Sequence, residues 1–277
     1  MHRSQFSAGT LFAALALATT AVHATSVSST TLSPFYITLV DLAPDDGVAP
    51  SIVLDPTSRS TVLPGAVSPG ASTYWLQQGD SAFGPVSSSG DLDGSGGSAS
   101  FAGDPLGAGA QLAASAVGGP SLAIGSGVAV VNSQPSGVNQ FVLSAQTQVT
   151  FSGYATLDWS AGTVNDAAYG EVDIDLSQDS TSFLDMEYLT GGYYGDGVGA
   201  LSGSTAGWVT ATFANDSDAS VEVNYYVGVF ANAAELEMIP PPIDEPAGAG
   251  LLLAGASMLL WGVRRRRWGA APPAPLQ

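Results

Sequence analysis

Polar and apolar side chains alternate with a period of two over much of the chain between residues 25 and 238. The clearest run extends from Gln148 to Trp159, where odd positions are apolar or small and even positions are polar. This alternation is typical of a strand with one buried and one exposed face. The sequence therefore predicts a half-buried strand, with Gly153 as a candidate bulge or bend.

The same pattern predicts several more strands. Their inward positions are Val172, Ile174 and Leu176; Val209, Ala211 and Phe213; and Val221, Val223, Tyr225, Val227 and Val229. Shorter candidates cover residues 35–42, 73–77, 122–131 and 138–144. Because roughly ten such segments occur without an amphipathic helix, we expect an all-β domain over residues 25–238, an antiparallel β-sandwich of jelly-roll-like topology.

Two tracts rich in Gly, Ser and Ala, residues 87–100 and 103–120, interrupt the apolar pattern. Such tracts lose much backbone entropy on ordering and offer little surface to bury. We expect them to be long surface loops or partly disordered connections within a single domain.

The N-terminal residues 1–24 have the pattern of a secretory signal peptide. A short positive start containing Arg3 precedes an apolar run from Phe6 to Val22, and the segment ends Val22-His23-Ala24. This ending suits signal peptidase, so we predict cleavage before Thr25. An uncleaved signal anchor is the alternative.

A second apolar segment, residues 247–263, has no charged side chain and follows a proline-rich spacer, residues 239–246. At about 1.5 Å per residue it reaches about 25 Å, enough for a short transmembrane helix. A basic block follows at once, and it consists of Arg264, Arg265, Arg266 and Arg267. The positive-inside rule places residues 264–277 in the cytoplasm and the acidic domain outside. A buried core helix is disfavoured because the segment has no polar face.

The order of these parts resembles the PEP-CTERM sorting signal, in which a Pro-Glu-Pro motif, a short helix rich in Leu, Ala and Gly, and an arginine cluster follow one another. Glu245 and Pro246 match the motif, and Leu251 to Gly255 and the basic block match the rest. Asp244 stands in the place of the first proline, and residues 268–277 trail the arginines. The resemblance implies processing by an exosortase as well as signal peptidase, in a Gram-negative bacterium that makes exopolysaccharide. An ordinary single-span anchor is the alternative.

The charge balance disfavours whole classes of function. All six basic residues are arginines, and between residues 25 and 246 only Arg59 accompanies all 24 acidic side chains. Binding of nucleic acid through its phosphates is therefore not expected.

The chain has no cysteine and no lysine, and its histidines, His2 and His23, lie in the leader. Ser-His-Asp and Cys-His nucleophiles, Schiff-base lysine and zinc sites with nitrogen or sulfur ligands are removed, so we predict that the protein is not an enzyme.

Carboxylates are the remaining chemical groups. Glu171, Asp173 and Asp175 alternate with apolar residues, which predicts three carboxyl groups about 7 Å apart on one strand face. That spacing overlaps that of glycosidase acid pairs, but no facing acid is evident. We favour a solvated strand face, with calcium bridging as the second interpretation. Asp91 and Asp93 in an Asp-Leu-Asp-Gly run also resemble part of a calcium loop, but we favour a plain turn, and a calcium site is the alternative.

Aromatic residues supply a possible surface for sugars. Tyr193 and Tyr194 lie between glycines in the run from Gly191 to Gly197, so we expect them in a flexible acidic loop. There we favour packing of the loop onto the sandwich, and stacking on a sugar is the alternative. Trp159 and Tyr225 fall on inward strand positions and are expected in the core.

These features together favour an exported cell-surface or exopolysaccharide-matrix protein with a structural or adhesive role. A carbohydrate-binding surface module that uses the loop tyrosines is the alternative. A glycosidase that uses carboxylates alone is a third possibility, and it requires two acids that face each other in a cleft. Calcium is the one cofactor that the composition suggests.

Overall fold

The structure is a computed structural model that describes residues 25–68, 70–119, 124–131, 139–179, 182–195 and 197–235. By its internal contacts the chain divides into two units, Met1–Glu237 and Met238–Gln277. All described residues belong to the first unit. The predicted signal peptide, spacer, transmembrane segment and basic tail lie outside the described residues.

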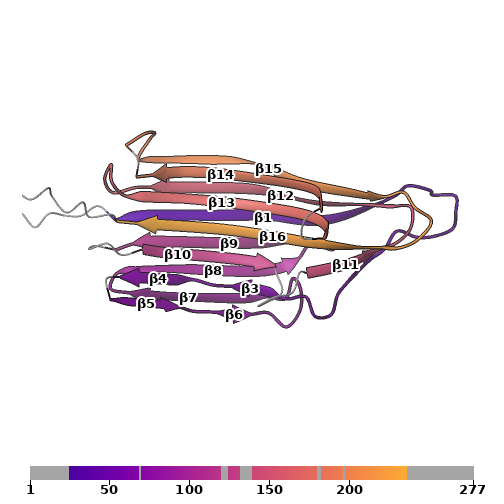
Figure 1. The fold of residues 1–277 in the computed structure, drawn as a ribbon, viewed down its shortest axis with the longest axis horizontal. Coiled ribbons are helices and arrows are strands. Elements are labelled where there is room, and N and C mark those ends of the chain that lie inside the picture. Colours follow the sequence, from indigo (N-terminus) through magenta and orange to yellow (C-terminus); the bar gives the residue numbers. More distant parts are fainter. Residues whose placement is uncertain are drawn as a thin grey trace, which may run out of the picture. The chain divides into compact units, whose positions relative to one another are not determined.

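The described part of the chain is all-β, and its long strands run side by side along the length of the unit (Figure 1). The strands are β1 (Ser26–Asp41), β2 (Ile52–Leu54), β3 (Ser60–Val62), β4 (Gly65–Ser68), β5 (Ala71–Tyr74), β6 (Gln77–Gln78), β7 (Val86–Leu92), β8 (Ser95–Asp104), β9 (Gly109–Gly118), β10 (Ile124–Val131), β11 (Asn139–Leu143), β12 (Thr147–Ser160), β13 (Ala167–Asp179), β14 (Ser182–Tyr194), β15 (Ser202–Asn215) and β16 (Val221–Ala234). Among the described residues, no helix is long and apolar enough to cross a membrane.

The strands form two antiparallel sheets that pack face to face. The six-stranded sheet has the order β15-β12-β1-β9-β8-β7. The ten-stranded sheet has the path β14-β13-β16-β10-β3-β6, with β11 also beside β16, β2 beside β11, β4 beside β10, and β5 beside β4. The predicted all-β class with antiparallel, sandwich-like sheets is confirmed.

Alternation in the sequence correctly identifies which side chains face the space between the sheets. In β12, Val149, Phe151 and Leu157 are fully buried, and in β13 the same holds for Val172 and Ile174. The predicted irregularity near Gly153 lies in the partner strand instead. β12 continues without interruption, and β1 shifts its register between Leu32 and Phe35, opposite this glycine.

Aromatic rings fill the centre of the core between the sheets. Phe141 stacks on Phe151 with ring centroids 5.8 Å apart, and Tyr225 meets Phe151 at 5.6 Å with an angle of 62° between the planes. Phe83 also stacks on Tyr225, with ring centroids 5.7 Å apart. The prediction that Tyr225 belongs to the core is confirmed, and burial of these large rings is the main source of hydrophobic stabilisation at this level of the sandwich.

The expectation that residues 87–100 and 103–120 form loops is wrong. These tracts form most of β7, β8 and β9, three neighbouring strands of the six-stranded sheet. Their side chains still alternate, although the inward residues are mostly as small as Ala99, Ala114 and Ala116. Ladder hydrogen bonds and tight packing of small residues replace the burial of large side chains here.

Small residues also allow the two sheets to approach closely at this place. A Cβ on Gly125 of β10 would overlap the carbonyl oxygens of Val117 and Gly96, which belong to β9 and β8 of the opposite sheet. A Cβ on Gly118 would lie 3.0 Å from the backbone nitrogen of Ala234. Gly118 and Gly125 are therefore required by backbone-to-backbone contact between the sheets.

Candidate functional site

Three acidic side chains follow one another on the outer face of β13, as predicted. Glu171, Asp173 and Asp175 are each half-buried, while Val172 and Ile174 between them point into the core. The outer face is therefore less solvated than a simple surface strand, because side chains from both neighbouring strands rise beside the acids.

Aromatic residues supply most of this cover. Tyr188 of β14 pairs with Asp173 in the register, and Tyr226 of β16 pairs with Asp175. The Tyr226 ring lies over Gly228, the partner of Asp173 on the other side, where an added Cβ would be 2.7 Å from the tyrosine hydroxyl. Phe230 stacks on Tyr226 with ring centroids 6.4 Å apart. The acids thus lie between Tyr188 on the β14 side and the stacked rings of Tyr226 and Phe230 on the β16 side.

This environment raises the pKa of each acid. Burial is the first cause for all three, and the charge of Asp173 adds to the rise in the pKa of Glu171 and Asp175. The carboxyl group of Asp173 also raises the pKa of Glu171 as a neighbouring polar group, and Glu171 in turn opposes the rise in the pKa of Asp173. Burial, with the nearby acids, likewise raises the pKa of Tyr226.

Acids with raised pKa values are suited to acid–base chemistry, but this site lacks a second acid that faces them. All three acids project from one face of one strand, whereas a glycosidase places two acids on opposite sides of the scissile bond. In the part of the chain that the structure describes, no three acidic side chains are grouped as ligands for one metal ion. One oxygen, Asp175 Oδ1, is buried without a hydrogen-bond partner.

The predicted calcium loop at Asp91 and Asp93 is a tight hairpin turn between β7 and β8. Asp93 and Gly94 both have positive φ, 53° and 81°, the conformation for which Asp-Gly is favoured in two-residue turns. The backbone N–H of Gly94 donates to Asp91 Oδ1 at 3.4 Å, and the Ser68 hydroxyl donates to Asp93 Oδ2 at 3.2 Å. The two carboxyl groups thus have separate partners.

Tyr193 and Tyr194 lie in a strand and not in the expected flexible loop, and Tyr193 packs into the sandwich, as the favoured interpretation had it. β14 continues through Tyr194, so neighbouring tyrosines point to opposite faces. Tyr193 is 1% exposed, and its hydroxyl donates to the Val164 carbonyl at 2.7 Å and accepts from the Gly197 N–H at 3.1 Å. Tyr194 is 55% exposed and packs on Tyr169 with ring centroids 5.1 Å apart.

The tryptophans also separate into different environments. Trp159 is half-buried against the small core cluster that contains Tyr193, in agreement with the predicted inward position. Trp208 is 59% exposed and meets Tyr154 edge-on, with ring centroids 5.7 Å apart, on the outer face of the six-stranded sheet. Trp75 is half-buried, and its indole ring packs directly onto the backbone of Gly90.

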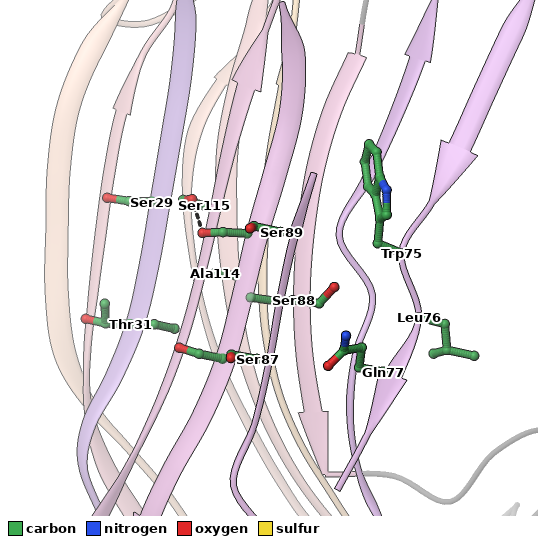
Figure 2. A pocket seen from close by; sticks show the side chains of 14 residues that line it. Ser29, Thr31, Trp75, Leu76, Gln77, Ser87, Ser88, Ser89, Ala114 and Ser115 are labelled. Atoms are coloured by element: carbon green, nitrogen blue, oxygen red, sulfur yellow. Dashed lines mark hydrogen bonds between the residues drawn. The ribbon is translucent and has the colours of Figure 1, made fainter. Parts of the chain in front are cut away.

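A groove of about 760 Å³ lies at the β7 side of the six-stranded sheet (Figure 2). Strands β1, β7, β8 and β9 supply one set of lining side chains, and the segment Trp75 to Gln77 supplies another. The lining residues are Ser29, Thr31, Trp75, Leu76, Gln77, Ser87, Ser88, Ser89, Ser98, Ala99, Ser100, Ala113, Ala114 and Ser115. None of these residues is ionisable, and most carry a hydroxyl group.

Sequence reasoning missed this groove because most of its residues lie in the tracts that were interpreted as loops. The available signal was the regular placement of serines at alternate positions, for example Ser87 and Ser89, and Ser98 and Ser100. That spacing predicts a hydroxyl-bearing strand face once the tract is recognised as a strand.

The sorting-signal residues Asp244, Glu245, Pro246 and Arg264 to Arg267 lie outside the described residues.

No protein-family model matches the chain, and no curated protein and no solved structure matches it.

Proposed function

We propose that this chain is an exported cell-surface or exopolysaccharide-matrix protein with a structural or adhesive role, built on a jelly-roll-like sandwich. In this proposal, signal peptidase removes residues 1–24, residues 247–263 hold the precursor in the inner membrane, and an exosortase processes the C-terminal signal. The order of the Glu245-Pro246 motif, the apolar segment and the basic block supports the route of export.

One structural observation carries the proposed role. The groove at β7 is lined by hydroxyl, amide and indole groups and by no ionisable side chain. Such a surface offers hydrogen bonds and apolar contact but no general acid, general base or charged nucleophile. It is suited to holding another molecule without changing it, which is the property that an adhesive or structural surface protein requires.

A carbohydrate-binding module remains the alternative, and the exposed Tyr154–Trp208 pair favours it. Exposed rings on a sheet face offer an apolar surface against which a sugar can pack. Tyr194 contributes a second exposed ring on the ten-stranded sheet. The two roles are compatible, since adhesion to a polysaccharide matrix needs a surface that binds sugar.

A carboxylate-only glycosidase is the less favoured candidate, and a direct assay distinguishes it. Purified protein is incubated with polysaccharides, including the producer's own matrix, and compared with Glu171→Gln and Asp173→Asn variants. We expect no turnover by any of the proteins. Turnover that is lost in a folded variant would contradict a non-enzymatic role, because it would assign chemistry to the β13 acids.

The route of export is tested by intact-mass analysis of the surface form in a host with and without an exosortase. With the exosortase present, we expect a mature protein that begins at Thr25 and lacks Arg264 to Arg267. Without it, the C-terminal residues should remain and the protein should stay with the membrane. A surface-exposed, extracellular form that retains the chain through Gln277 would refute the sorting proposal.

A further inference from the structure

Strand β7 is the last strand of the six-stranded sheet and pairs with a neighbour, β8, on one side only. A two-residue turn joins the two strands, so Leu92 and Ser95 form the hydrogen-bonded pair that closes the hairpin. Hydrogen-bonded and non-hydrogen-bonded pairs alternate in an antiparallel ladder, so every second residue of β7 directs its backbone groups to β8. The others, Ser87, Ser89 and Asp91, direct their N–H and C=O groups away from the sheet.

These outward backbone groups have no hydrogen-bond partner in the part of the chain that the structure describes. The side chains of Ser87 and Ser89 are exposed, and that of Ser88 between them turns toward Trp75 (Figure 2). A row of unpaired backbone donors and acceptors is a template on which a further strand can pair. The open feature is therefore the backbone of β7, whatever its side chains contribute.

The opposite side of the sandwich is protected against such pairing. At β15, the other end of the same sheet, the Thr212 N–H donates to Asp185 Oδ2 of β14 at 2.7 Å. Glu187 of β14 pairs with the inward residue Ile174, so a second charge lies on the inner side of that edge. Inward-pointing charges on an edge strand keep further strands away. β7 has no charged side chain before Asp91, so its edge lacks this protection.

The three outward residues of β7 are symmetric about Ser89. When a second β7 strand lies antiparallel to the first with a two-fold axis at Ser89, this residue pairs with its own copy. Ser87 then pairs with Asp91 of the second copy, and the same pair occurs again on the other side of the axis. Each pair exchanges two backbone hydrogen bonds, so every outward N–H and C=O group of the three residues is satisfied. A second copy of the chain therefore fits this edge.

Charge and side-chain size favour the same arrangement. A parallel, in-register pair would set Asp91 beside its own copy, and like charges directly opposite each other are destabilising. The two-fold arrangement instead sets each Asp91 carboxylate opposite the Ser87 hydroxyl, which can donate to it. On the inner side, Ser88 lies opposite Gly90 of the second copy. These small residues leave room for the Trp75 ring, which in each copy packs on its own Gly90.

We infer that β7 is a self-association edge, through which two copies of this chain pair antiparallel about Ser89 and join their six-stranded sheets into one continuous sheet. Between residues 25 and 246 the chain carries one arginine and 24 acidic side chains, so long-range repulsion opposes the approach of two copies. Salt screens that repulsion, so pairing should strengthen as the ionic strength rises. The inference goes beyond the proposed export and adhesion and depends on neither.

Single cysteines test the pairing in the full chain, in membranes of cells that express it, because the chain has no cysteine of its own. Mild oxidation should link Ser89→Cys into disulfide dimers, since Cα atoms of a hydrogen-bonded pair lie about 5.5 Å apart, within disulfide range. The matched control is Ser87→Cys, which is also exposed on β7 but lies about 15 Å from its own copy across the axis. We expect several-fold more linked dimer from Ser89→Cys, and more at high salt.

Mixed chains test the register. Differently tagged Ser87→Cys and Asp91→Cys chains should link to each other, and neither should link to itself. Adding Ser89→Pro to both chains should abolish this linkage, because proline lacks the outward N–H and leaves the bonds to β8 in place. Adding Ser89→Ala should preserve it, because the backbone groups remain. Melting curves of the purified variants establish that each is folded. Ser89→Arg, which would meet its own charge at the axis, serves if Ser89→Pro does not fold.

Three results overturn the inference. The first is equal linkage of Ser89→Cys and Ser87→Cys, which would indicate random collision. The second is linkage of Ser89→Cys to a different protein in place of its own copy, which would assign the β7 edge to another partner. The third is linkage between the mixed chains that persists with Ser89→Pro in both of them.

Discussion

At the scale of single residues, position along a strand decides the role of a side chain more than its chemical type does. Tyr193 and Tyr194 are adjacent and chemically identical, yet one is 1% and the other 55% exposed. The buried tyrosine carries a hydroxyl that is satisfied by Val164 and Gly197, two backbone groups of the flanking loops. Tyr193 therefore acts as a structural link between those loops.

Tyr193→Phe should lower the free energy of unfolding by about 1–3 kcal/mol, because the Gly197 N–H and the Val164 carbonyl lose their partner. The matched control, Tyr194→Phe, removes a hydroxyl from an exposed ring and should change stability by less than about 0.5 kcal/mol. Thermal melts followed by circular dichroism measure both. Equal effects of the two substitutions would show that the buried hydrogen bonds are not the cause.

The β13 acids predict a dependence of stability on pH. Burial raises the pKa of Asp173 in the folded state, so the folded chain binds more protons than the unfolded chain between the ordinary pKa of 3.8 and the raised value. Stability from this group is therefore highest on the acidic side of that window and falls as the pH rises through it. The raised pKa values of Glu171 and Asp175 act in the same direction.

Asp173→Asn removes this ionisation and should raise the melting temperature at pH 7 by about 1–2 °C while leaving it nearly unchanged at pH 4. Asp45→Asn, in an exposed loop, removes the same formal charge and serves as the control for overall charge repulsion. Melting temperatures of the three proteins between pH 4 and pH 8 provide the test. A gain in Asp173→Asn that is the same at every pH would rule out the buried carboxylate as its source.

At the scale of elements, the sequence predicts strands correctly where apolar side chains are large and fails where they are small. The segments that contain Phe151, Ile174 and Val227 were located with the right inward faces, because large alternating residues are a strong signal. β7, β8 and β9 were missed because their inward side chains are Ala, Ser and Gly, whose burial depends on what the opposite sheet presents. The contact of Gly125 with β8 and β9 is a tertiary feature without a local signal.

The sequence does not predict the candidate groove, because its strands have small inward side chains. It does predict the β13 acids, Glu171, Asp173 and Asp175, as one strand face. Alternation alone places Glu171 and Asp173 on one face, but it does not report the rings that cover them from β14 and β16. Those neighbours are distant in sequence, so the cause of the raised pKa values is visible only in the fold. A site made from one strand is predictable, and a site made from several strands needs their order and register.

The close approach of the sheets gives a prediction for a single glycine. Gly125→Ala should destabilise the fold by about 1–3 kcal/mol, because the new methyl group overlaps the carbonyl oxygens of Val117 and Gly96 and forces the sheets apart. Gly207→Ala in β15 is the control, since the nearest atom to its Cβ is 4.0 Å away. Chemical denaturation of both variants measures the difference. If Gly125→Ala is as stable as Gly207→Ala, the sheets are not held in contact at this place.

At the scale of the whole molecule, the negative charge of 24 acidic side chains between residues 25 and 246 is opposed by a single arginine. Arg59 donates to the carbonyl oxygens of Pro56 and Ser58, and is the only basic side chain in the part of the molecule that is described. Repulsion among the acids therefore opposes compactness, and it is relieved by dissolved cations.

Calcium should stabilise the mature protein more than sodium does at the same ionic strength, without supporting any turnover. Cations that bind only the folded state add stability by mass action, about 2.7 kcal/mol at a concentration 100 times the dissociation constant. Thermal melts with calcium, with magnesium, and with chelator in sodium salt separate a site from general screening.

Two double variants then locate the site, because the calcium response should shrink in only one of them. Asp91→Asn/Asp93→Asn tests the hairpin between β7 and β8, and Asp173→Asn/Asp175→Asn tests the β13 acids. Identical midpoints with calcium and with chelator would reject calcium as a stabilising ion and leave charge repulsion to be relieved by screening alone.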